Sequence, residues 1–179
     1  MSVAAMSLLV QQYLLATLIV IVPGNHDYMW GHSPYRKENF PKNVYIFDKE
    51  QISCFSFPEI GVDVYGYAFT SDGYTENPLE KKLQLQKSRV NVLVAHGDVG
   101  GKSKYCPLSV NDIVKSGFDY IALGHIHLGG RVQLAGNTFT VGVGLPKVII
   151  HRVQISCFLQ FSTCHIIPPL TLPAKRAFQ

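Results

Sequence analysis

Hydrophobic residues along this chain gather in short runs, and three of these runs lead directly into a glycine or histidine motif. Residues 17–22 are an unbroken series of β-branched and aliphatic side chains, and residues 90–95 and 120–123 come close to the same pattern. An apolar run of about four to eight residues is typical of a strand that is buried on both faces. The pattern therefore predicts three buried strands over these ranges.

Shorter patterns predict the elements around these strands. Alternating apolar and polar residues indicate further strands, and amphipathic or capped patterns indicate helices. The expected strands cover residues 43–47, 51–57 and 62–69, with a charged turn at 48–50, and hairpin strands follow at 131–134, 138–143 and 148–153. The expected helices cover residues 7–16, 79–88 and 109–116, the last ended by Gly117, and a long polar loop covers 28–43.

The composition is that of a globular protein with much buried strand. The chain has 179 residues, of which 47% are hydrophobic and 16% charged, so it is long enough to bury a sizeable core. The net charge of +4 permits an anionic substrate such as nucleic acid, but no dense basic tract demands one. Four scattered cysteines without a zinc-like spacing favour a reduced cytoplasmic protein. Residues 11–13 interrupt the first apolar stretch, which favours a buried helix and strand over a membrane span.

Each of the three predicted buried strands leads into a short polar motif. Gly-Asn-His-Asp stands at 24–27, His-Gly at 96–97 and Gly-His-Ile-His at 124–127. A strand end is a common position for a metal ligand, because the sheet holds the loop that carries it. Asparagine, histidine and aspartate together suit a divalent transition metal such as Mn, Fe or Zn. The combination indicates metal-assisted cleavage of a phosphate ester, in which metals activate water and neutralise developing charge.

In this order, the three motifs resemble the last three motifs of the calcineurin-like metallophosphoesterases. Residues 118–127 are especially similar to the DNA-repair exonuclease branch, the SbcD-like nuclease subunits, and residues 43–47 and 64–66 fit the same branch. The resemblance covers about residues 12–140. It implies an α/β fold, part of a four-layered αββα sandwich with the metal site at the strand ends. It also implies a hydrolase whose parent family cleaves DNA phosphodiesters with two metals.

The resemblance assigns a role to the polar residues of the motifs. It implies a general acid or transition-state stabiliser at His26, with Asp27 as the partner that orients it. Structural alternatives remain open: a plain turn for Asn25 and His26, a helix N-cap for Asp27, and satisfied core histidines at His96 and His125. The implied ligands of one metal are Asn25, His96 and His125, and the implied ligand of the other metal is His127.

Charged and histidine residues outside the motifs have less specific interpretations. Four basic residues in loops near the expected site are either solvated charges or contacts to a phosphate backbone, which would make binding depend on salt. These are Arg36, Lys37, Lys102 and Lys104. Three histidines belong to no motif, and we expect structural roles for His32, His151 and His165.

Two motifs of the family pattern have no counterpart before Gly24. The pattern opens with Asp-x-His and Gly-Asp-x-x-Asp/Asn, which supply the Asp and His of one metal and the Asp that bridges both. Residues 1–23 contain no Asp, Glu or His. The resemblance therefore predicts a fragment that lacks the first strands of the fold, with residues 1–22 partly exposed. One metal would keep only His127, so we expect one bound metal or none, and weak or no catalysis.

The far end of the chain also departs from the family pattern. We expect a partial metallophosphoesterase domain over residues 1–140 and a divergent tail over 141–179. The branch usually continues past its Gly-His-x-His hairpin into a Tyr-Pro-Gly-Ser-like turn, and nothing similar follows residue 141. A frameshifted or misassembled reading frame would explain so abrupt a change.

The sequence leaves three functions open. The first is a fragment of an SbcD-like exonuclease with a dinuclear site, which implies Mn rather than Fe or Zn, DNA as substrate and an SMC-like ATPase as partner. The second is a non-catalytic module that retains one metal and binds phosphate or a partner protein. The third is a nucleotide or protein phosphatase of the same superfamily. For all of them we expect a cytoplasmic protein without a membrane segment.

Overall fold

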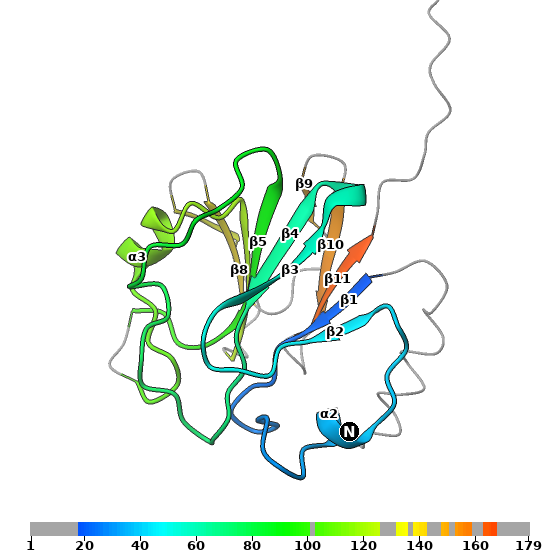
Figure 1. Cartoon of the computed structure of the whole chain (residues 1–179). Helices are drawn as coiled ribbons and strands as arrows, with labels where there is room; N and C mark the ends of the chain where they lie inside the picture. Colours follow the sequence, from blue (N-terminus) through cyan, green and yellow to red (C-terminus); the bar gives the residue numbers. More distant parts are fainter. Residues whose placement is uncertain are drawn as a thin grey trace, which may run out of the picture.

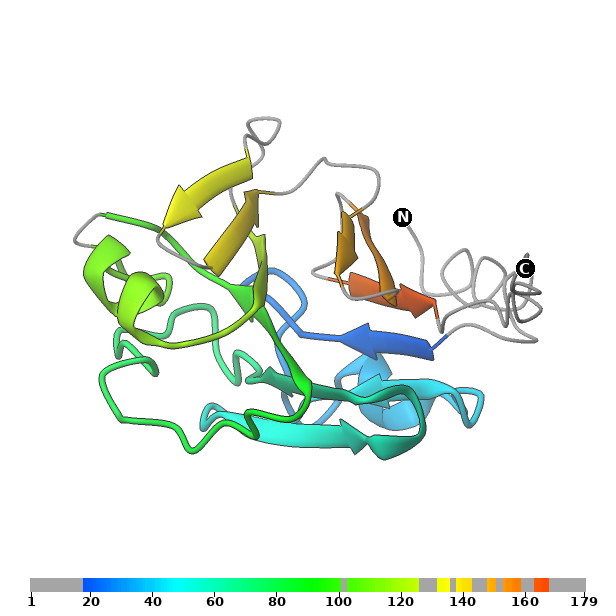
Figure 2. The ribbon, with the colours of Figure 1, turned by 90° about the horizontal axis from the view of Figure 1, so that it is seen from above.

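Two β-sheets lie face to face in the computed structural model of the chain (Figures 1 and 2). The structure describes residues 18–100 and 103–125 and, beyond these, the backbone of five strands between residues 132 and 167. Strands run in parallel in part of each sheet, and short helices and loops cover the outer faces. The predicted α/β class is therefore confirmed.

The first sheet contains five strands in the order β2-β1-β11-β10-β9. Strand β1 (Leu18–Ile21) pairs in parallel with β2 (Val44–Ile46) on one side and antiparallel with β11 (Thr163–Ile167) on the other. Two more antiparallel strands, β10 (Val153–Phe158) and β9 (Val148–Ile150), extend the sheet beyond β11. Strand β1 is therefore an interior strand with a neighbour on each edge.

The second sheet contains six strands in the order β3-β4-β5-β6-β8-β7. Its middle strands β4, β5, β6 and β8 run in parallel, and β3 and β7 pair antiparallel at the two edges. The strands are β3 (Ser53–Phe57), β4 (Val62–Gly66), β5 (Val90–His96), β6 (Tyr120–Gly124), β7 (Val132–Ala135) and β8 (Thr138–Gly142). Because β5 and β6 are parallel neighbours, they end at the same edge of the sheet.

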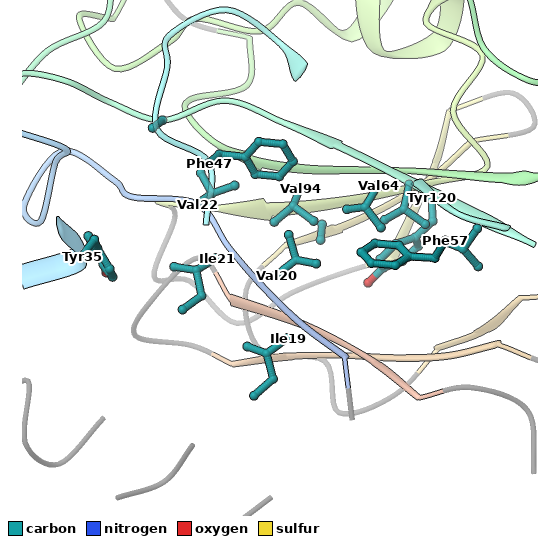
Figure 3. Close-up of a cluster of buried hydrophobic side chains, with 14 of the residues drawn as sticks. Ile19, Val20, Ile21, Val22, Tyr35, Phe47, Phe57, Val64, Val94 and Tyr120 are labelled. Carbon is teal, nitrogen blue, oxygen red and sulfur yellow. The ribbon is translucent and has the colours of Figure 1, made fainter. Parts of the chain in front are cut away.

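The core between the sheets is built from alternate residues of facing strands. Figure 3 shows Val20 of β1 close to Val64 and Val94 of the second sheet, and all three belong to one buried cluster with Phe57 and Tyr120. None of these three valines is more than 1% exposed. Burying an aliphatic side chain of this size contributes roughly 1.5–3 kcal/mol, so this layer holds the two sheets together.

The opposite face of the second sheet carries a second hydrophobic cluster. Leu93 and Ile121 alternate with the inward residues of their strands and pack there with Leu108 and Ile113. Ile113 lies on helix α3 (Val110–Lys115), and loop residues between 69 and 108 supply much of the remaining cover. Strands buried on both faces have to be apolar at successive positions, which explains the nearly unbroken runs at β5 and β6.

The predicted helix at 109–116 is confirmed as α3, with the expected signals at both ends. Ser109 is the N-cap, and its side-chain oxygen accepts the backbone N–H of Asp112 at 3.0 Å. Gly117 follows the helix with φ +78°, a conformation that glycine adopts without strain. The predicted loop at 28–43 contains a single helical turn, α2 (Pro34–Lys37), and a 3-10 turn, η1 (Pro58–Ile60), precedes β4. Among the described residues, no helix has the length and hydrophobicity needed to span a membrane.

The predicted amphipathic helix at 79–88 is wrong, because the structure contains no helix in this segment. Leu83 and Leu85 both pack against the outer cluster. Side chains two residues apart share a face in an extended chain but not in a helix. Asn77 also accepts the N–H of Leu79 at 3.0 Å and donates to Asp112 at 2.7 Å, which ties the start of the segment to α3. Tertiary contacts therefore override helical propensity here.

The expected exposure of the first strand is also wrong for the described residues. Ile19, Val20 and Ile21 are at most 1% exposed, because β2 and β11 flank β1 and both faces are covered. Three strands of the region expected as a divergent tail, β9, β10 and β11, complete this sheet. The predicted helix at 7–16 lies outside the described residues.

Phe47 offers a test of the packing between β2 and the second sheet. Its ring is 1% exposed, lies 4.6 Å from the ring of Phe55 between centroids, and occupies the space beside Gly66. We expect Phe47→Ala to lower the free energy of unfolding by about 3–5 kcal/mol, measured by urea denaturation followed by circular dichroism. The control is Val110→Ala, at a side chain 53% exposed, which should change it by about 0.5 kcal/mol or less. Equal effects of the two substitutions would contradict this packing.

Candidate metal centre

Three strand ends bring polar side chains to one place. His96 is the last residue of β5, and it pairs in register with Gly124, the last residue of β6, so His125 lies directly beside it. Asn25 arrives from the other sheet, on the turn that follows β1. The predicted cluster of Asn25, His96 and His125 is thus built from both sheets.

The donor atoms of this cluster lie close together. Asn25 Oδ1 is 2.8 Å from His96 Nε2, and His125 Nδ1 is 3.2 Å from the same nitrogen. The two imidazole rings meet edge to face with their centroids 5.0 Å apart. Asn25 is buried and both histidines are partly exposed, so the cluster is open to solvent on one side.

These separations suit a shared metal ion. Donor atoms about 2.1 Å from one ion and at right angles to each other lie about 3 Å apart, which both measured separations approach. One amide oxygen and two imidazole nitrogens are a donor set for Mn, Fe or Zn. Within the described residues, no group of three or more His, Cys, Asp and Glu side chains forms a metal site, and the third donor here is an amide. The residues present therefore fit one divalent metal ion.

The position of His96 depends on close packing from three sides. A Cβ atom on Gly24 would lie 2.6 Å from the nearest atom of the His96 ring, so only glycine fits there. The ring of Phe69 meets the imidazole edge to face at 5.3 Å, and the hydroxyl of Tyr67 donates to the His96 carbonyl at 2.8 Å. Tyr105 packs against the second imidazole, with its ring centroid 4.8 Å from that of His125. The rings are therefore held in place by neutral, mostly apolar neighbours.

His125 has an unusual backbone conformation. Its φ of +94° lies in the left-handed region that glycine favours. For a residue with a side chain this costs on the order of 1–3 kcal/mol, and such strain often occurs at functional sites. The strain fits a residue whose side chain has to turn out of the β6 strand toward His96.

Asp27 holds the turn that carries Asn25 and His26. One carboxylate oxygen accepts the backbone N–H of Gly24 at 2.8 Å, and the other accepts the hydroxyl of Tyr35 on α2. Burial first, and then the Asp27 carboxylate, raise the pKa of Tyr35 well above its usual range, so the phenol remains a donor. His26 is exposed at the tip of this turn.

These contacts bear on the predicted roles of the remaining motif residues. The helix N-cap alternative for Asp27 is wrong, because the next helix, α2, begins after Ser33. The Asp27 carboxylate accepts hydrogen bonds from Gly24 and Tyr35, and its predicted action on His26 stays a prediction. His127 lies outside the described residues. No sequence pattern predicted the contacts of Tyr35, Phe69 and Tyr105, because Tyr35 lies on the single turn of α2 and the other two lie in loops whose path is set by tertiary packing.

The basic residues predicted near the site lie on its outer parts. Arg36 and Lys37 are exposed in the single turn of α2. Lys104 lies with its ammonium 5.2 Å from the ring centroid of Tyr105 and 3.3 Å from a carboxylate oxygen of Asp72. Lys102 lies outside the described residues. The Tyr105 ring therefore contacts both the ammonium of Lys104 and the imidazole of His125.

A cavity of about 810 Å³ lies elsewhere, at the edge where β5 and β6 begin. Its lining includes Leu83, Leu85 and Asn91 and none of the candidate ligands. This cavity and the polar cluster are thus at opposite ends of the same strands. We assign the metal chemistry to the cluster, because donor atoms and not volume determine a metal site.

Comparison with known proteins relates most of this chain to one family. The family model described as "Calcineurin-like phosphoesterase" matches residues 4–129. The "Uncharacterized metallophosphoesterase YhaO" of Bacillus subtilis (strain 168) is 31% identical over 115 residues, which cover 61% of this chain and 28% of that relative. The chain thus spans well under half the length of this curated relative. No solved structure gives a significant match.

Gly24 offers a test of the cluster without any metal. We expect Gly24→Ala to displace the His96 ring, because the added methyl group would lie 2.6–2.9 Å from three ring atoms. The ring signals of His96 and His125 in two-dimensional NMR spectra should shift, as the bond to Asn25 breaks. Gly31→Ala is the matched control, since an added methyl group there meets nothing within 4 Å. Unchanged ring signals in Gly24→Ala would show that the close approach is not present.

Proposed function

The chain belongs to the calcineurin-like phosphoesterase family, and we propose that it carries part of the site of a metal-dependent phosphodiesterase that resembles the DNA-repair exonucleases. The observation that supports this proposal most is that Asn25, His96 and His125 converge from three strand ends. The distance from His96 Nε2 is 2.8 Å to Asn25 Oδ1 and 3.2 Å to His125 Nδ1. Packing alone does not account for an amide and two imidazoles gathered at the edge of a sandwich, because alanine or valine would fill that space better.

The proposed metal is Mn, with Fe and Zn as the alternatives that the same donors accept. The residues that would hold it are Asn25, His96 and His125, and His127 is the proposed ligand of a second ion. A bound divalent metal would polarise the phosphate and lower the pKa of a coordinated water. The chain itself contributes the position of the donors, which Gly24, Phe69 and Tyr67 fix.

His26 is the proposed general acid. It is exposed at the tip of a turn that the Asp27 carboxylate holds from within, through Gly24 and Tyr35. An imidazole so placed could donate a proton to the leaving alkoxide of a phosphate ester. Asp27 would then act by holding the turn that carries both His26 and Asn25.

DNA is the proposed substrate, and an SMC-like ATPase the proposed partner, in a cytoplasmic setting. Support for the exonuclease branch comes from the resemblance of residues 118–127. Phe118, Tyr120 and Ile121 of this stretch are at most 1% exposed in and before β6, so the resemblance concerns the strand that positions His125. The rival functions are a non-catalytic module with one metal and a nucleotide or protein phosphatase.

Metal titration tests the proposed centre. We expect one Mn²⁺ ion per chain by isothermal titration calorimetry and elemental analysis. His96→Ala should lower the affinity by at least about 10–100-fold, the range found when even a group that supports a ligand is lost. His32→Ala is the control, because His32 is an exposed histidine outside the cluster. Absence of binding, or equal binding by the two variants, would contradict the assignment.

Hydrolysis of bis-p-nitrophenyl phosphate with Mn²⁺ tests the catalytic competence of this chain. The only carboxylate within the three motifs is that of Asp27, which binds Gly24 and Tyr35, so the motifs supply none to bridge two metals and we expect weak turnover or none. A non-catalytic module that retains one metal would give the same result. Rapid turnover that His125→Ala abolishes would overturn this expectation and favour a complete site.

A further inference from the structure

Trp30 is an exposed aromatic residue in the loop that follows the metal-binding turn. It is the only tryptophan of the chain, and 48% of it is exposed. Tryptophan side chains are highly buried on average, although single exposed apolar residues are common on protein surfaces. Exposure alone therefore carries no conclusion, and the surroundings of the ring have to be considered.

The loop around Trp30 is anchored on both sides. The N–H of Met29 donates to the carbonyl of Phe69 at 2.7 Å, and the N–H of Ser33 donates to the carbonyl of Trp30 at 3.0 Å. Met29 is 4% exposed and Ser33 is fully buried. The ring is thus presented outward between two buried neighbours, on backbone that hydrogen bonds hold in place.

The same contacts bring Trp30 close to the metal cluster. Phe69, which accepts the bond from Met29, packs its ring against His96 at 5.3 Å. The loop also begins directly after the turn of His26. On its other side, the ring of His32 meets Trp30 edge to face at 5.3 Å, so the exposed surface consists of two rings.

Positive charge lies on the element that continues this loop. Arg36 and Lys37 are exposed in α2, one turn beyond His32, followed by the acidic Glu38. The ion pairs found among the described residues involve other side chains, Arg89 with Asp63 and Lys104 with Asp72. Two exposed cations on the element that follows two exposed aromatic rings are a combination that single-stranded nucleic acids bind, with phosphates on the cations and bases on the rings.

We propose that Trp30 stacks on a base of a single-stranded nucleic acid whose phosphate backbone contacts Arg36 and Lys37 as it enters the metal cluster. The proposal deepens the proposed function, on which it rests, by naming the form of the substrate. Bases of a single strand expose their faces, whereas those of a duplex are covered by their neighbours. A phosphoprotein offers no base for Trp30, so the stacking site distinguishes nucleic acid from the substrate of a protein phosphatase, and a single nucleotide lacks the phosphodiester backbone that would reach Arg36 and Lys37.

Intrinsic fluorescence reports this contact directly, because Trp30 is the single tryptophan. The chain is titrated in EDTA, without metal, with oligothymidylate and with an abasic deoxyribose-phosphate oligomer of equal length and charge. Oligothymidylate should quench the fluorescence and the abasic oligomer should not.

Anisotropy with labelled oligothymidylate should give an affinity about 10-fold lower for Trp30→Ala and an intermediate value for Trp30→Phe, with Val110→Ala unchanged. A double substitution of Arg36 and Lys37 by Gln should make the slope of log K against log[salt] shallower by about 1.4, because two phosphate contacts are lost.

The outcomes separate this proposal from the metal centre. Equal binding of the base-containing and abasic oligomers, or unchanged affinity in Trp30→Ala with a native circular dichroism spectrum, would overturn the stacking site even if Mn²⁺ binds at His96. Quenching by oligothymidylate that persists while Mn²⁺ fails to bind would support the stacking site and overturn the metal assignment. Tighter binding of duplex than of single strand would overturn the preference for a single strand.

Discussion

The close approach of Gly24 to the ring of His96 is the contact on which the candidate centre depends. Gly24 follows a strand of the first sheet and His96 ends a strand of the second, so this contact joins the sheets at one edge of the sandwich. It leaves no room for a Cβ atom, and it brings Asn25 Oδ1 within 2.8 Å of the imidazole. The centre therefore exists only while the two sheets remain packed.

Two kinds of force position the donors. The pair His96 and His125 is set by the backbone ladder between parallel strands β5 and β6, whose register is fixed by main-chain hydrogen bonds. The approach of Asn25 is set by side-chain packing between the sheets, in which Val20 lies against Val64 and Val94 (Figure 3). Loss of core packing should therefore separate the amide from the imidazoles before it separates the imidazoles from each other.

The loop after β1 combines rigid anchors with exposed chemistry. Asp27 binds Gly24 and Tyr35 from within, and buried Met29 and Ser33 hold the next part of the loop. Polar and aromatic groups that could meet a substrate, above all His26 and Trp30, are left on the outside. A loop held in this way loses little conformational freedom when a ligand binds, which favours affinity.

The sequence by itself determined the class of fold and the three buried strands, and it singled out Asn25, His96 and His125 as candidate ligands, because apolar runs and strand-end motifs are local signals. It also predicted α3 from its cap and its glycine. It misplaced residues 79–88 as a helix, since its leucines pack on a cluster formed by distant elements. Only the tertiary structure decided that β1 is covered on both edges, that Asp27 accepts a hydrogen bond from Tyr35, and that the loop before Trp30 is joined through Met29 to Phe69, whose ring packs on His96. Each of these facts depends on contacts between segments far apart in the chain, and no local pattern encodes them.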